Sequence, residues 1–154
     1  MRAAAAAGLS VVATAESSIV GCAIAVDAAT EYALAQNQPP SNAISALLQA
    51  LRATAPKPRP GACLLVDMAV VDPDHTGQGT YTAMRSAVHD RARAAGYRSV
   101  RGELSSTATQ RVCVEHLGHR VLGAVHYAGF AHDGLYPFAA ISDPASILLV
   151  EGAL

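Results

Sequence analysis

The sequence has 154 residues, of which 51% are hydrophobic and 15% are charged, and its 11 Lys and Arg nearly balance its 12 Asp and Glu. That length supports one domain with a real core, while the charged fraction lies well below the roughly 25% of ordinary soluble domains, which excludes a disordered, highly charged chain. A net charge of −1 gives no cationic surface for nucleic acid, and no run approaches the ~18 apolar residues of a membrane span.

The first fifteen residues combine an Ala-rich run with a short apolar segment. This segment resembles a short secretory signal peptide, because it has one Arg, a run of Ala and the sequence Ala-Thr-Ala at 13–15. Because alanine is only weakly hydrophobic and a single Arg precedes it, a strand is the better interpretation. The cysteines Cys22, Cys63 and Cys113 are odd in number and far apart, which is typical of a reducing compartment. We therefore expect a cytoplasmic protein.

A hairpin and a helix are predicted in the first third of the chain. Residues 9–15 and 19–26 are apolar, and the short polar break between them favours a β-hairpin. Residues 27–40 are polar and end in two prolines, so we expect a loop. Ser41 is then a candidate N-cap for a helix that must end before Pro56. The apolar positions of this helix are Ile44, Leu47, Leu48 and Leu51, at the i, i+3, i+4, i+7 spacing.

A long apolar strand and the helix after it form the predicted centre of the fold. Residues 62–71 are apolar except for Asp67, which predicts a central strand covered on both faces. A tight turn with Gly77 and Gly79 follows, and a helix is expected over about 80–95, with Gly96 as its stop. The residues expected on the inner face of this helix are Met84, Ala87, Val88 and Ala95.

The rest of the chain is predicted to complete the sheet. Residues 97–104 are a strand, and a shorter helix capped by Ser106 or Thr107 runs to Leu117, with Gly118 after it. A strand-like segment covers 120–130, and a hairpin turn at 132–134 leads to a returning segment at 135–141. This order places a βαβ unit at the centre and an antiparallel pair at the end.

Residues 71–84 carry the most informative pattern, in which a strand runs into a glycine-containing turn and a helix starts at once. The first turn of a helix presents unpaired N–H groups and the positive end of its dipole, so this turn suits a phosphate or diphosphate. The sequence has no GxxxxGK[ST] and no GxGxxG, which disfavours a P-loop nucleotide triphosphatase and a dinucleotide site. On the turn alone, an ordinary tight connection and a nucleotide-phosphate binder of another fold are alternatives.

Residues 67–79, Asp-Met-Ala-Val-Val-Asp-Pro-Asp-His-Thr-Gly-Gln-Gly, resemble the acetyl-CoA-binding motif of the GCN5-related N-acetyltransferases, V-x-P-x-x-(R)-G-x-G between a strand and a helix. The resemblance spans about residues 18–141. It continues through 96–97, 101–106, 109–113 and 117–119, and through positions that fit the arylalkylamine-acetyltransferase-like branch: Tyr127, Phe130, Gly134, Pro137 and Phe138. The implied fold is α/β (mixed α+β), with a central mixed β-sheet flanked by helices in three αβα layers.

The resemblance implies an acetyl-CoA-dependent N-acetyltransferase that acts on the amine of a small molecule by direct attack in a ternary complex. The backbone of 69–71 would pair with the pantetheine arm as another strand does, and N–H groups of 77–81 would hold the diphosphate. A β-bulge near Ala69 would splay two parallel strands around the thioester. The expected cofactor-binding residues are Ala69, Val70, Val71, Thr76, Gly77, Gln78, Gly79, Thr80, Tyr81, Ser106 and Gln110, and no metal is expected.

The resemblance also implies catalytic residues. Asp67 interrupts an apolar strand at a proton-path position of the branch, and burial would raise its pKa into the range of a general base. The alternatives are a solvated residue at a strand end or one that holds the amine by charge. Ser105 and Thr109 match positions where the family has hydroxyls near the sulfur of CoA. Ser106 matches such a position as well, but helix capping is an alternative role for it. An N–H near Val70 would face the charge that develops on the thioester oxygen.

The sequence departs from the family at three points, of which the last two favour an alternative, a catalytically weak or inactive acyl-CoA-binding module. Asp74 or Thr76, depending on the register, stands where the family has Gln or Arg. Val114 stands where many members have the Tyr that protonates the thiolate. The predicted elements start at the family's second strand, so the alternatives are a truncated copy and a pocket completed by a partner chain. An Ala-rich exposed first strand is also a candidate surface for pairing with a second copy in a homodimer.

Other polar residues have structural interpretations. For Glu103 an ion pair with Arg101 or Arg111 is the alternative to a catalytic role, and Cys113 is expected to be a small core residue. His116 and His119 straddle a helix end and are expected to diverge rather than to bind zinc.

Overall fold

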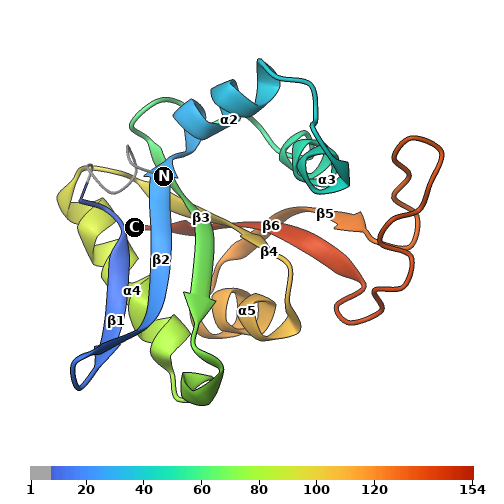
Figure 1. Ribbon diagram of the computed structural model, residues 1–154. Helices are drawn as coiled ribbons and strands as arrows, with labels where there is room; N and C mark the ends of the chain where they lie inside the picture. The colour runs from blue at the N-terminus through green and yellow to red at the C-terminus, as the bar shows by residue number, and fades with distance from the viewer. Residues whose placement is uncertain (1–7) are drawn as a thin grey trace.

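The computed structural model describes residues 8–154, and it is built around one six-stranded mixed β-sheet with the order β1-β2-β3-β4-β6-β5 (Figure 1). Only the pairing of β3 with β4 is parallel. The strands are β1 (Val11–Ala15), β2 (Ser18–Asp27), β3 (Cys63–Val71), β4 (Ser99–Leu104), β5 (Arg120–His126) and β6 (Ser146–Ala153). The Ala-rich run at 3–7 lies outside the described residues.

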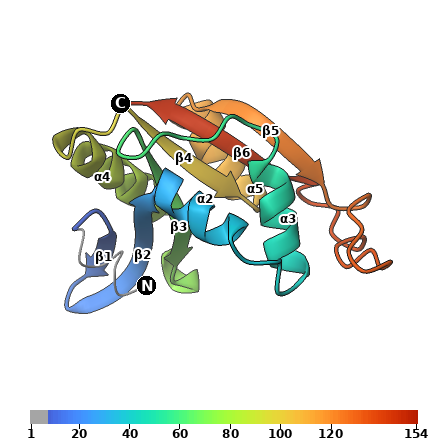
Figure 2. The same cartoon turned by 90° about the horizontal axis from the view of Figure 1, so that it is seen from above.

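Helices cover both faces of the sheet, α2 and α3 on one face and α4 and α5 on the other (Figures 1 and 2). The helices are α2 (Ala28–Gln36), α3 (Ala43–Arg52), α4 (Thr80–Ala94) and α5 (Thr107–Arg111), with the 3-10 turn η1 (Pro73–His75) and the π-helical turn η2 (Val112–His116). The three-layer αβα prediction is therefore confirmed.

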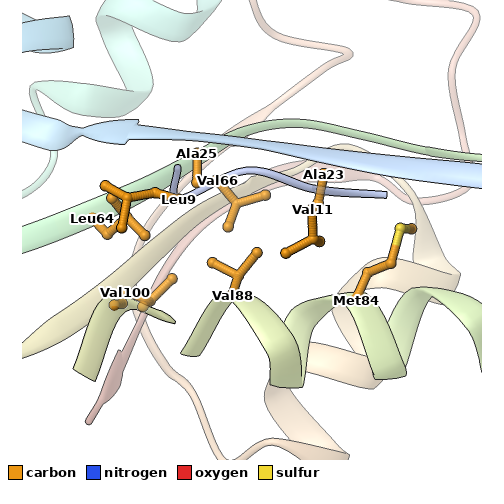
Figure 3. Close-up of a cluster of buried hydrophobic side chains, with 10 residues drawn as sticks. Leu9, Val11, Ala23, Ala25, Leu64, Val66, Met84, Val88 and Val100 are labelled. Atoms are coloured by element: carbon orange, nitrogen blue, oxygen red, sulfur yellow. The ribbon is translucent and has the colours of Figure 1, made fainter. Parts of the chain in front are cut away.

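The largest core cluster lies between α4 and the first four strands (Figure 3). Met84, Val88 and Ala92 of α4 are buried there against valines, leucines and alanines of the sheet. Each fully buried aliphatic side chain contributes about 1.5–3 kcal/mol relative to exposure, so this cluster fixes α4 on the sheet. The predicted inner face of α4 is correct for Met84, Ala87 and Val88, whereas Ala95 is exposed because the helix has ended there.

The predicted hairpin at the start and the predicted βαβ unit at the centre are both confirmed. The turn between β1 and β2 has Glu16 in the left-handed region, at φ 53°. The unit β3-α4-β4 joins two parallel neighbours through one helix, which Gly96 ends at φ 85°. β1 is an edge strand, as a homodimer through it requires, and that dimer stays a prediction.

The stretch predicted as a loop at 27–40 contains the helix α2, so that prediction is wrong. Its only buried side chains are Ala28 and Tyr32, a stripe too short to show as helical periodicity. Asp27 caps α2, and Asn42 rather than Ser41 caps α3 through a reciprocal pair of bonds with Ser45.

The predicted returning segment at 135–141 forms no strand. The strand predicted over 120–130 is β5, and it ends at His126 rather than at Phe130. The turn exists, with an isolated bridge between His132 and Leu135, but the chain then loops on before it returns as β6. β6 inserts between β4 and β5, which completes the predicted antiparallel pair with a different segment. Several short apolar runs could have filled this place, and periodicity alone does not choose between them.

Candidate functional site

An opening between β3 and β4 is the feature around which the predicted site residues gather. Hydrogen-bonded pairing of these parallel strands ends at Val66 and Gly102, although β3 continues to Val71 and β4 to Leu104. The backbone of 68–71 therefore pairs with β2 on one side and has no strand on the other. Because the strands are parallel, the helices that follow them, α4 and α5, both begin at this same edge of the sheet.

A bulge at Asp67 causes the separation. Ala25 pairs with Val66 and Ile24 pairs with Met68, so Asp67 is an extra residue without a partner on β2. The extra residue reverses the alternation of faces. Before the bulge, Leu64 and Val66 face the α4 core, whereas after it Ala69 and Val71 do so, and Met68 and Val70 are exposed on the other face.

The prediction that the central strand is covered on both faces therefore fails beyond residue 66. Met68 is 50% exposed and Val70 is 56% exposed, while Cys63 to Val66 are buried. An exposed apolar half-strand next to a free backbone edge is a surface on which an extended apolar ligand can lie.

The N-terminus of α4 is open at this edge. Its N-cap, Gly79, is in the left-handed region at φ 82° and provides no side-chain cap, whereas Asp27, Asn42 and Ser106 each cap their own helix. The N–H groups of the six residues 77–82 have no acceptor among residues 8–154, and the first intrahelical bond is that from Ala83 to the Gly79 carbonyl. These donors, with the positive end of the helix dipole, form a potential anion site.

The side chains of this turn are directed back into the turn rather than outward. The Thr76 hydroxyl donates to the Pro73 carbonyl at 2.8 Å, and the Gln78 amide donates to the Asp74 carbonyl at 3.0 Å. The Thr80 hydroxyl is 3.3 Å from the His75 carbonyl oxygen. The predicted residues Thr76, Gly77, Gln78, Gly79 and Thr80 thus lie together and present backbone rather than side-chain donors.

Tyr81 is directed into the protein. Its hydroxyl is 3.5 Å from Cys113 Sγ, and its ring packs beside Leu104 and Val150. Burial raises the pKa of the Tyr81 phenol, so that the hydroxyl stays protonated. Cys113 is fully buried, as predicted for a core residue, and Val114 is part of the same cluster.

The far side of the opening is formed by the end of β4 and the start of α5. Ser106 caps α5 by accepting from the Thr109 N–H, and the two hydroxyls are 2.9 Å apart. The Gln110 amide donates to the carbonyls of Leu104 and Ser146, which ties α5 to two strands. Ser105 is exposed. Of the predicted hydroxyls, those of Ser106 and Thr109 are thus engaged in the cap.

Asp67 is exposed, so the expectation that it is buried is wrong. It stands at the bulge on the face of α2 and α3, and its Oδ1 is 4.0 Å from Arg52 Nη2. Arg52 is 8% exposed in its side chain and also approaches Glu31 at 3.6 Å. A cation between two carboxylates thus lies beside the opening.

The partner of Glu103 is Arg52, and neither Arg101 nor Arg111 as predicted. Arg52 binds it with two bonds, Nε to Oε1 at 2.6 Å and Nη2 to Oε2 at 3.0 Å. Burial raises the pKa of Glu103, and the guanidinium beside it opposes that shift. Arg101 binds Glu151 instead, at 2.7 Å, and Arg111 binds Glu115. Glu103 is therefore committed to holding α3 on β4.

A groove of about 190 Å³ opens beside Asp67 on this face of the sheet. Its charged lining is Glu31, Arg52 and Asp67, and the rest comes from α2, α3 and the loop between them: Ala35, Gln38, Pro39, Pro40, Ser41, Ser45, Leu48 and Gln49. No aromatic side chain lines it. The sequence analysis missed Glu31 because α2 was interpreted as a loop, and it missed Arg52 because the carboxylates that Arg52 approaches lie on other elements. The alternation of faces along the strand 99–104 was a signal that the Glu103 side chain lies on a covered face of the sheet and therefore needs a buried partner.

Two further observations concern residues 8–154 as a whole. They contain no group of three His, Cys, Asp or Glu side chains arranged to hold a metal ion. None of their helices combines the length and the apolar character needed to cross a membrane.

No protein-family model and no curated protein sequence matches the chain, but solved structures do. An agmatine N-acetyltransferase, solved as an apo mutant, is 21% identical with a TM-score of 0.79, over 99% of this chain and 77% of its own. Arylalkylamine N-acetyltransferase 2 from Aedes aegypti is 14% identical with a TM-score of 0.80, over 99% of this chain and 76% of its own. A putative acetyltransferase from Salmonella typhimurium, solved with acetyl-CoA, is 15% identical with a TM-score of 0.56, over 97% of this chain and 68% of its own.

Proposed function

The chain has the fold of the GCN5-related N-acetyltransferases, and from this premise we propose that it transfers the acetyl group of acetyl-CoA to the amine of a small molecule by direct attack in a ternary complex. The observation that carries the proposal is the run of N–H groups at 77–82 without acceptors, placed at the edge where β3 and β4 separate. Acetyl-CoA combines a diphosphate, an extended arm and a thioester, and the site offers a matching surface for each.

The chain's own residues fit the coenzyme in three places. The N–H groups of Gly77, Gly79 and their neighbours donate to the diphosphate. The free backbone edge at Ala69, Val70 and Val71 takes the place of a neighbouring strand for the pantetheine arm. A backbone N–H near Val70, that of Ala69 or Val71, faces the charge that grows on the thioester oxygen, because Val70 itself is paired with Cys22 of β2. Ser106 and Gln110 hold α5 against the other side of the opening.

The acceptor amine binds in the groove beside Asp67. Glu31 and Asp67 attract an ammonium group there, because the cation between them, Arg52, is already paired through two bonds with Glu103. The amine must lose a proton before it attacks, and Asp67 is the carboxylate nearest the bulge. Glu103 is unsuited to that role because both of its oxygens accept from Arg52. A small polar amine fits this lining better than an aromatic one, since no ring stands in the groove.

The thiolate that leaves is stabilised by groups at the start of α5. The exposed Ser105 hydroxyl is the freest of the predicted donors, while Thr109 shares its hydroxyl with the cap. A thiolate is a good leaving group, so a hydroxyl or a water suffices as the proton donor in place of the tyrosine that Val114 replaces.

The three cysteines are free, which supports a cytoplasmic location.

The test combines coenzyme binding with turnover. Calorimetric titration should show binding of acetyl-CoA, and free thiol should be released when agmatine, other small diamines or dopamine are added, with the acetylated product identified by mass spectrometry. Binding with no turnover on any amine would support the alternative of an acyl-CoA-binding module. A failure to bind CoA in a folded sample would refute both.

A further inference from the structure

A buried cationic cluster lies between α4 and the sheet, away from the opening. Arg85 and His89 lie one turn apart on α4, and His119 follows η2. Arg85 is 0% exposed and His119 is 3% exposed. The rings of His89 and His119 are stacked, with centroids 5.1 Å apart and planes inclined by 15°. These residues play no part in the site proposed for acetyl transfer.

Two glycines in neighbouring strands make room for the cluster. Gly102 of β4 pairs with Val150, and Gly152 of β6 pairs with Val100, so both glycines face α4. A Cβ atom at Gly102 would lie 3.3 Å from the guanidinium nitrogens of Arg85, and one at Gly152 would overlap the His119 ring. The sheet thus has a hollow at this point that polar side chains fill.

The hollow contains hydrogen-bonding atoms without partners. Within residues 8–154, neither Nε nor the two Nη atoms of Arg85 have an acceptor, and both ring nitrogens of His119 and Nε2 of His89 are also unpartnered. A guanidinium stays charged in proteins, so it cannot escape its burial by losing a proton. A buried charge with no counter-charge costs several kcal/mol.

No carboxylate of the described chain supplies the counter-charge. Glu103 and Glu151 stand next to the two glycines in sequence, but their alternation directs them to the opposite face, where Arg52 and Arg101 bind them. Asp90 of α4 is exposed and pairs with Arg93. Burial of the rings, and after it the charge of Arg85, lowers the pKa of His89 and of His119 to about 4, so both imidazoles are neutral at pH 7. The cluster therefore carries one net positive charge.

We propose that Arg85, His89 and His119 form a binding site for one small monovalent inorganic anion, of the chloride class. One such anion balances the guanidinium and accepts from it and from the imidazole N–H groups, whereas water supplies acceptors but no charge. The neighbouring side chains, Val88, Val100, Leu104 and Val150, are buried and apolar, which limits the site to an ion without bulk. The anion joins α4 to β4 and β6, so it is a structural ligand of the helix whose N-terminus carries the phosphate donors.

The test measures thermal unfolding at pH 7.5 and constant ionic strength while chloride replaces isethionate, a bulkier anion of the same charge that the packed apolar neighbours exclude. The melting temperature of the wild-type protein should rise by about 4 °C for each tenfold increase of chloride above its dissociation constant. The Arg85→Met variant should lose this dependence. The Arg93→Met variant, changed at an exposed arginine of the same helix, should keep it.

A second measurement does not depend on the folding of Arg85→Met. Crystals of the wild-type protein grown with bromide should show an anomalous peak within hydrogen-bonding distance of Arg85. The proposal is overturned by an ordered water in place of the bromide, by a wild-type melting temperature that does not change with chloride, or by equal chloride dependence in Arg85→Met and Arg93→Met. A bromide peak without chloride-dependent stability would indicate an adventitious ion only and would overturn it as well.

Discussion

The sharpest test of the phosphate site is the substitution Gly79→Ala. Gly79 is in the left-handed region at φ 82°, and a Cβ built there meets no atom within 4 Å. The only direct cost is therefore backbone strain, about 1 kcal/mol of stability. Relief of that strain turns the peptide plane and moves at least one N–H out of line with a bound diphosphate. A charge-assisted bond contributes about 1.5–3 kcal/mol, so the dissociation constant for CoA should rise about 10- to 150-fold.

The matched control is Gly96→Ala at the other end of the same helix. Gly96 has φ 85° and also has no atom within 4 Å of a built Cβ, so the strain is the same. With a rise of 1.5 Å per residue, the 15 residues of α4 put it roughly 22 Å from the phosphate donors. The assay is calorimetric titration with CoA and with pantetheine, which lacks the diphosphate, alongside urea unfolding of each variant.

Both variants should lose about the same stability, and only Gly79→Ala should lose affinity for CoA. Pantetheine should bind wild type and both variants alike. If the two variants bind CoA equally tightly while their stabilities fall equally, the N-terminus of α4 does not hold the diphosphate, and the reasoning from its free N–H groups is refuted.

Three further outcomes are expected. Arg52→Leu should lower the free energy of unfolding by about 3–5 kcal/mol in urea titrations, because Glu103 is left buried without its cation. In chloride-free buffer the free energy of unfolding should fall as the pH falls from about 6.5 to about 4. Burial and the charge of Arg85 lower the pKa of His89 and His119 in the folded protein, so in this pH range the two imidazoles bind more protons in the unfolded chain than in the folded one. Asp67→Asn should reduce kcat about 10²- to 10⁴-fold with nearly unchanged affinity for acetyl-CoA.

Each of these outcomes has a control. The double variant Arg52→Leu/Glu103→Leu should recover much of the lost stability, and simple additivity would contradict the buried pair. Replacement of both imidazoles by Asn should flatten the pH dependence in that window, and an unchanged slope would assign it to other groups. Asp74→Asn, at an exposed carboxylate of the turn, should leave kcat unchanged, and an equal loss in both variants would remove Asp67 from the role of base.

The central unit was accessible from the sequence because several local signals agree there. The apolar run before residue 72, the two glycines and the helix that follows all require the same strand, turn and helix, and the structure has them. Backbone donors at a helix start depend only on where the helix begins. The strand, the turn and the free donors at the helix start could therefore be predicted from one sequence, whereas the grouping of 69–71 with 76–81 in one site was implied by the family resemblance.

The residues that were missed depend on contacts across the sheet. The ion pair of Arg52 with Glu103 joins segments 51 residues apart, and alternation predicts a face but no partner. Asp67 interrupts an apolar run, which is equally consistent with a buried acid and with a bulge. Only the register with β2 distinguishes them.

Arg85 had a readable signal that was not used. Tyr81, Arg85, Val88 and Ala92 are spaced by four, three and four residues, which places Arg85 on the inner face of α4. Average burial preferences argue against an arginine there, and the glycines that admit it lie on other strands. A buried arginine of this kind is visible in sequence only as a break in an otherwise apolar helical stripe.

The single unpaired residue in β3 has a consequence for how such a protein could lose its activity. Removal of Asp67 would make Met68 follow Val66 in regular pairing with β2, with Met68 and Val70 still on the face away from α4, and would let β3 run on beside β4. The product would be a better sheet with no gap for a ligand. Selection for stability alone would favour that shorter strand, so the extra residue marks a place where the chain keeps an imperfect ladder in order to bind something in it.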